Sequence, residues 1–206
     1  MKTEVNPTRM EMMNLKKKLI VARHGHKLLK DKQDELMRRF MEILEDVKVL
    51  RTQVEDEIKE AYKFFLLSRL SMSREIMDEA LMLPQVDMQL TFSSIKVLNV
   101  DTPKLDFKLK GDIFSYGFLS TSSDLDSALK KYLQLFPKMI KLAEIEKRAE
   151  LLSQEIESTR RRVNALEYVL IPELVETIKY IDMRLNGAEL GNQLRLMKIK
   201  EIVRKH

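Results

Sequence analysis

The sequence predicts a mainly α-helical protein built on a long antiparallel two-helix coiled coil, formed by its N-terminal and C-terminal helices. Charged residues make up 33% of the chain and aromatic residues only 6%, with five glycines and five prolines, a composition typical of long helices. Two segments at opposite ends of the chain repeat apolar residues in alternating steps of three and four, as coiled-coil seams do. The residues between them favour short helices and a β-hairpin.

The first region, residues 1–82, is predicted to be the first long helix. Thr8 followed three residues later by Glu11 is the pattern of a capping box, so we expect the helix to begin near Arg9. No proline lies between Pro7 and Pro84, and we expect the helix to continue to about Ala80. Its seam has 14 positions, 11 of them apolar: Leu15, Leu19, Ala22, His26, Leu29, Gln33, Leu36, Phe40, Ile43, Val47, Leu50, Val54, Glu57 and Ala61.

The second region, residues 83–122, is predicted to hold a β-hairpin and a loop. Leu105, Phe107 and Leu109 alternate with charged residues, which is typical of a strand with one apolar face. The segment NVDTPK (99–104) supplies turn residues, so we place the turn there. Because a lone hairpin is marginally stable in water, we expect it to pack against the helices or a partner.

The third region, residues 123–206, is predicted to hold a short helix leading into the second long helix. Ser123 with Asp126 is expected to cap the short helix DSALKKYLQLF (126–136). The seam of the long helix then follows, with eight of nine positions apolar: Leu142, Ile145, Ala149, Leu152, Ile156, Thr159, Val163, Leu166 and Leu170.

The second seam changes register around Pro172. Three successive steps of four residues carry it through Leu170 and Leu174, which is the pattern of a stutter. Pro172 lies inside this interruption, and we expect a local kink there. The seam then resumes to the end of the chain: Leu174, Ile178, Ile181, Leu185, Ala188, Asn192, Arg195, Ile199 and Ile202.

The sequence contains no recognised catalytic motif. It has no GxxxxGK[ST] or GxGxxG phosphate-binding loop, no HExxH, no GxSxG and no calcium-loop pattern. It has no cysteine, which excludes a disulfide or thiolate metal site. We therefore expect no catalytic, cofactor or metal site. His26 lies on the first seam, where two interpretations are a polar residue that fixes register and a metal ligand.

Two basic clusters and one glycine remain without an assigned role. Three lysines (Lys16, Lys17 and Lys18) and three arginines (Arg160, Arg161 and Arg162) stand in rows on the two helices. Three interpretations are open: solvated flanks of the coil, contacts with an acidic partner, and nucleic-acid binding. Gly25 either allows close backbone approach or is tolerated at a cost of about 1 kcal/mol relative to alanine. No apolar run reaches the ~20 residues of a membrane helix.

Five ordered blocks of the sequence carry a family resemblance. The chain resembles the D subunit of the rotary V/A-type ATPases and ATP synthases over NPTRM (6–10), ARHGHKLLKDKQDEL (22–36), YGFLSTSSDLDSA (116–128), RRRVNALEYVLIPELVETIKYI (160–181) and LRLMKIK (194–200). The resemblance implies a non-catalytic central rotor shaft that couples ATP hydrolysis or synthesis to ion transport. An alternative function is a coiled-coil adaptor or tether with basic partner-binding patches.

The resemblance also implies partners and a location. The expected partners are the catalytic and non-catalytic nucleotide-binding subunits of a hexameric ring, a small F subunit and a funnel-like subunit above the membrane ring. Neither nucleic acid nor direct membrane insertion is expected, and the complex would lie peripherally on the cytoplasmic side of the membrane. Arg160–Arg162 and Lys16–Lys18 become candidate contacts with acidic loops of the ring.

One segment departs from the family pattern. Residues 187–193 read GAELGNQ where the family usually has a charged run without glycine. Two glycines weaken a helix by about 2 kcal/mol in sum. This leaves the continuity of the helix beyond Asn186 open.

Overall fold

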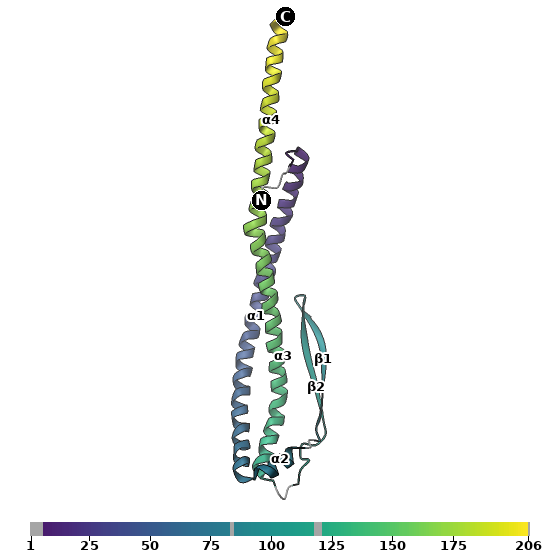
Figure 1. Cartoon of the computed structure of the whole chain (residues 1–206), viewed down its shortest axis with the longest axis vertical. Helices are drawn as coiled ribbons and strands as arrows, with labels where there is room; N and C mark the ends of the chain where they lie inside the picture. Colours follow the sequence, from purple (N-terminus) through teal and green to yellow (C-terminus); the bar gives the residue numbers. More distant parts are fainter. Residues whose placement is uncertain (1–5, 83–84, 118–120, 206) are drawn as a thin grey trace. The chain divides into compact units, whose positions relative to one another are not determined.

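The computed structural model describes residues 6–82, 85–117 and 121–205, and these residues are mainly helical (Figure 1). The chain divides into two compact units: a terminal unit, Met1–Glu35 with Ile156–His206, and a middle unit, Leu36–Glu155. The elements are α1 (Arg9–Ser71), α2 (Arg74–Met82), β1 (Asp87–Val97), β2 (Val100–Lys110), α3 (Ser123–Ala165), the π-helix η1 (Leu166–Leu170) and α4 (Ile171–Lys205). The predicted fold class is confirmed.

In the middle unit, α1 and α3 pack as an antiparallel pair. Arg51 of α1 lies 3.7 Å from Glu146 of α3, Glu57 pairs with Lys138, and Glu60 lies 2.7 Å from Lys131. The residue numbers of α3 therefore decrease as those of α1 increase, which shows that the two helices are antiparallel. The buried side chains between the helices fall on the predicted first seam and on α3: Leu36, Val47, Val54, Ala61, Leu125, Ala128, Leu135 and Leu152.

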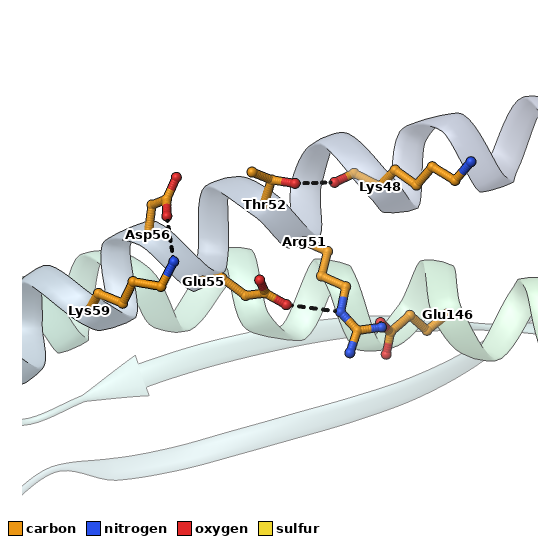
Figure 2. Close-up of polar contacts among 7 residues, drawn as sticks. All are labelled: Lys48, Arg51, Thr52, Glu55, Asp56, Lys59 and Glu146. Carbon is orange, nitrogen blue, oxygen red and sulfur yellow. Dashed lines mark hydrogen bonds and ion pairs between the residues drawn. The ribbon is translucent and has the colours of Figure 1, made fainter.

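Ion pairs run along the exposed flanks of this helix pair. Figure 2 shows Arg51 of α1 between Glu55 of the same helix, 3.1 Å away, and Glu146 of α3. The hydrogen bond from Lys59 to Asp56 raises the pKa of that lysine, and the bond from Lys131 lowers the pKa of Glu60. Because Lys59 and Glu60 are both fully exposed, these two ion pairs contribute little to stability.

In the terminal unit, the N-terminal part of α1 packs antiparallel against the end of α3 and against α4. His26 contacts Glu167 at 3.3 Å, and Arg9, the first residue of α1, pairs with Glu189. The buried residues again occupy seam positions: Leu15, Ala22, Ile156, Thr159, Val163 and Ile181. The predicted cap is confirmed, because the Thr8 hydroxyl accepts a hydrogen bond from the Glu11 N–H at 3.2 Å.

The first helix ends earlier than predicted. The structure stops α1 at Ser71 and starts α2 at Arg74, so the expected continuity to Ala80 is wrong. Ser68 donates to the carbonyl of Phe65, and Ser71 donates to that of Ser68. Serine side chains compete in this way for backbone groups at helix ends, and the Ser73 hydroxyl then caps α2 through the N–H of Ile76.

The second long helix starts earlier than predicted. Residues 126–136 form no separate short helix, because α3 continues without a break from Ser123 to Ala165 and contains Pro137. The carbonyl that Pro137 leaves unpaired can reach solvent, since Pro137 is exposed. The cap also differs: the hydroxyl of Ser122, not Ser123, accepts the N–H of Asp124 at 3.1 Å. Asp126 instead accepts the phenol of Tyr116 at 2.7 Å, and burial together with this bond raises the tyrosine pKa.

The hairpin forms as predicted, but its turn comes earlier. β1 and β2 pair antiparallel from Asp87↔Lys110 to Val97↔Val100, so the turn is Leu98–Asn99 rather than residues 99–104. Both turn residues have positive φ, 50° and 68°, which is the pattern of a type I′ turn. The hairpin lies beside α3 (Figure 1), where Leu105 N–H donates to Glu144 at 3.0 Å. Phe107 also packs edge-on against Phe136, with ring centroids 6.0 Å apart.

The leucine at this turn is conformationally strained, which gives a stability prediction. A left-handed conformation costs a residue with a Cβ about 1–2 kcal/mol, and asparagine tolerates it better. We expect Leu98→Asn to slow amide hydrogen exchange across β1 and β2, with a stabilisation of about 1 kcal/mol. The opposite control is Gly111→Ala, because φ is 110° there and the new Cβ would overlap the carbonyl oxygen of Gln85. Faster exchange in Leu98→Asn would contradict the strain.

The last helix is continuous through the glycine-containing segment. α4 runs from Ile171 to Lys205 without a break at Gly187 or Gly191, which settles the continuity beyond Asn186. A Cβ added at either glycine would meet nothing within 4 Å. Within the described residues, no helix is both long enough and apolar enough to cross a membrane.

Candidate partner-binding surface of the terminal unit

The π-helix η1 lies where the seam changes register. The N–H of Ile171 bonds the carbonyl of Leu166, five residues back, instead of the four of an α-helix. Such a turn takes up one residue more than an α-helical turn. The second seam passes through η1 in three steps of four residues, from Leu166 to Ile178. These steps contain one residue more than the regular steps of four, three and four. We infer that η1 accommodates the extra residue, so the interruption takes the form of a wide turn.

Burial on the far side of η1 follows the shifted register. Ile181, which the shift places on the seam, is fully buried. Tyr180, which an unshifted seam would place there, is 48% exposed. Pro172 has no backbone N–H, so the carbonyl of Tyr168, four residues earlier, lacks its helical donor. Both Pro172 and Tyr168 are exposed. Solvent can therefore satisfy that carbonyl, and the proline is compatible with a helix that continues.

An apolar groove lies beside η1, and we call it the η1 groove. Its volume is about 580 Å³, and it is lined by Lys17, Lys18, Val21, Ala22, Gly25, Leu166, Leu170 and Leu174. Gly25 needs no close backbone approach, because a Cβ built there would meet nothing within 4 Å. The glycine borders open space, so no other part of the described chain approaches its backbone closely. Leu170 remains 41% exposed although it occupies a seam position.

The two basic clusters differ in what they contact. Lys16, Lys17 and Lys18 are all exposed, but only Lys17 and Lys18 line the groove. Across the described ranges, no carboxylate forms an ion pair with either of these two lysines. Arg160, Arg161 and Arg162 are exposed between the buried Thr159 and Val163, and Arg161 pairs with Glu157 of its own helix. The structure therefore leaves Lys17 and Lys18 available at an apolar surface.

The polar seam residue His26 contacts the π-helix. Its Nε2 lies 3.3 Å from a carboxylate oxygen of Glu167, the second residue of η1. This contact between α1 and η1 is suited to fixing their register. In the described part of the chain, no three histidine, aspartate or glutamate side chains gather as a metal site would require. Sequence reasoning missed both the groove and this contact. The only available signal was a glycine, Gly25, directly before the seam histidine His26.

The C-terminal end of α4 exposes an apolar surface. Because α1 begins at Arg9, beside Glu189, the last part of α4 has no α1 residues opposite it in the described chain (Figure 1, yellow end). Five predicted seam positions are accordingly exposed: Ala188, Asn192, Arg195, Ile199 and Ile202. The seam prediction is therefore wrong for the C-terminal end of α4. Seven large apolar side chains here are 56–69% exposed: Leu190, Leu194, Leu196, Met197, Ile199, Ile202 and Val203.

The architecture defines a class of protein. A coiled coil with an uncovered apolar tip and a basic apolar groove is typical of a subunit that works inside a larger assembly, because contiguous exposed apolar surface marks interaction sites. The chain belongs to the ATP synthase D subunit family, whose model matches residues 11–201, and this family provides the central stalk of rotary V-type ATPases.

Three relatives, each named as the D subunit of a V-type ATP synthase, support this membership. The chain is 51% identical to that of Acetivibrio thermocellus over 203 residues, which cover 97% of this chain and 91% of the relative. It is 47% identical to that of a Thermoanaerobacter species, covering 98% and 97%, and 48% identical to that of Clostridium novyi, covering 98% and 95%. The resemblance noted in the sequence is confirmed, and the adaptor alternative is not favoured.

Proposed function

We propose that this chain is the non-catalytic rotor shaft of a V-type ATP synthase and couples nucleotide chemistry in a surrounding ring to ion transport. The observation that carries the proposal is the tip of α4. It exposes seven large apolar side chains beyond the start of α1, a surface that needs a partner around it. A stiff two-helix coil is suited to transmit torque because bending it would break packed seam contacts.

The proposed contacts follow from the exposed basic residues. Six basic residues would contact acidic loops of the catalytic and non-catalytic ring subunits: Arg160, Arg161, Arg162, Lys16, Lys17 and Lys18. All six are exposed, which supports their availability. Arginine suits such a contact because its guanidinium can bond a carboxylate through two N–H groups.

The proposal extends to the rest of the chain. Regions 1–82 and 123–206 would supply the shaft. Residues 83–122 would supply the hairpin, to which the family resemblance gives a role in stimulating ATP hydrolysis. The small F subunit would bind the side of the coil, and the funnel-like subunit its other end. The chain would lie on the cytoplasmic side of the membrane, peripherally, without nucleic acid and without inserting into the bilayer.

A reconstitution tests this function. The purified chain is mixed with its F subunit and the nucleotide-binding ring, and native mass spectrometry gives the stoichiometry. We expect one copy of the chain per ring and a higher ATPase rate than that of the ring alone. The control is a chain truncated after Glu189, which keeps the Arg9 contact but lacks the apolar tip. Failure of the full chain to join the ring at low salt would rule out the shaft.

A further inference from the structure

We propose that the η1 groove is a docking site for a protein segment of the nucleotide-binding ring that presents a large apolar side chain next to carboxylates. The proposal rests on the proposed function for the identity of the partner. The chemistry of the partner segment comes from the groove itself.

The floor of the groove calls for an apolar side chain. The floor is formed by six residues without hydrogen-bonding side chains: Val21, Ala22, Gly25, Leu166, Leu170 and Leu174. Val21 is 70% exposed and Leu170 is 41% exposed, so this apolar surface is left in water by the chain itself. Covering it is favourable by about 25 cal/mol for each Å² removed from water. Gly25 adds depth because no Cβ occupies its position.

The edge of the groove calls for negative charge. Lys17 and Lys18 border it, and long lysine side chains place apolar stems along such a surface while the ammonium groups remain in water. Glu167, the acidic residue of η1, contacts His26. The lysines therefore keep a net positive edge, which attracts a carboxylate and disfavours a cationic segment.

The shape of the groove favours a protruding protein segment. Its volume of about 580 Å³ exceeds that of one side chain, and it is bordered by two helices that leave it open to solvent. A loop can place an apolar residue on the floor and adjacent acidic residues at the lysine edge in one contact. The wide turn η1 provides Leu166 and Leu170 of this floor, so the interruption of the seam also shapes the docking surface.

The first test fills the groove without disturbing the fold. Gly25→Leu adds a side chain that starts in open space, and we expect affinity for the ring to fall about tenfold or more, the loss expected when one leucine-sized side chain stays exposed. Two matched controls should bind as the parent chain does. Gly25→Ala leaves the groove open, and Gly117→Leu adds the same side chain outside both the groove and the apolar tip, also in open space. Affinity is measured by titrating labelled chain, in complex with its F subunit, with the ring.

The second test examines the charge at the edge. We expect the double change Lys17→Glu and Lys18→Glu to weaken binding and to flatten its dependence on salt concentration. The control pair is Lys27→Glu and Lys30→Glu, two exposed positions on α1 outside the groove, which change the net charge equally. Equal losses in both pairs would show a general charge effect and would overturn the acidic partner.

The outcomes separate this inference from the proposed function. If the parent chain binds the ring and Gly25→Leu binds equally well, the groove proposal is overturned while the shaft stands. If the parent chain does not bind the ring, the proposed function fails and the inference fails with it. Binding of anionic vesicles that Gly25→Leu abolishes, or self-association that it abolishes in light scattering, would identify a lipid or a second copy as the occupant and overturn the ring segment.

Discussion

Replacing Ile181 by alanine is expected to destabilise the terminal unit by about 2–5 kcal/mol, the cost of removing a buried branched side chain and leaving a cavity. Ile181 is fully buried on α4, beyond the π-helix. Its burial depends on the register shift, since an unshifted seam would place Tyr180 at the interface instead. The substitution therefore measures how much packing the shifted seam contributes.

The measurement should be local, because a long coiled coil does not unfold as one two-state unit. Amide hydrogen exchange of α4 and of the facing part of α1 reports opening of the terminal unit. The matched control is Met183→Ala on the same helix, where the side chain is 66% exposed and we expect a change within about 0.5 kcal/mol. Equal effects at the two positions would show that the seam beyond η1 is not a packed core.

The seam positions could be predicted from the sequence because a coiled coil is a local, periodic pattern. Leu36, Val54 and Leu152, which the spacing of three and four selects, are all buried. The pattern fails where the partner helix ends: Ile199 and Ile202 continue the spacing but have no α1 residue opposite them and stay exposed. Periodicity shows which face of a helix is apolar, whereas the length of the other helix decides whether that face is covered.

The helix boundaries that sequence reasoning missed depend on single hydrogen bonds. Ser71 and Ser73 end one helix and begin another through side-chain bonds, although neither glycine nor proline marks the break. Pro137 suggests a break but lies inside α3, where exposure lets water replace the lost bond. The groove escaped prediction because it depends on which side of the helix Gly25 faces and on the width of η1.

Deleting Pro172 is expected to remove the π-helix while keeping both flanking segments on the seam. The deletion shortens the step from Leu170 to the next leucine from four residues to three, which restores a regular alternation of three and four. Since a π-turn takes up one extra residue, removing that residue lets the helix return to α geometry. The assembled complex should form, but the η1 groove loses the wide turn that shapes its floor, and we expect most ATP-driven ion transport to be lost.

The control for this deletion is Pro172→Ala, which restores an N–H donor but keeps the extra residue. If spacing causes the wide turn, the alanine variant keeps η1 and its transport, and only the deletion changes them. If the proline causes it, both variants lose η1 and behave alike. Amide exchange over residues 166–174 reports the turn, and ion transport per ATP hydrolysed in the reconstituted complex reports coupling. A deletion variant that loses η1 yet transports normally would contradict a role for the wide turn in torque transfer, because the shaft would then act only through its regular seam and tip.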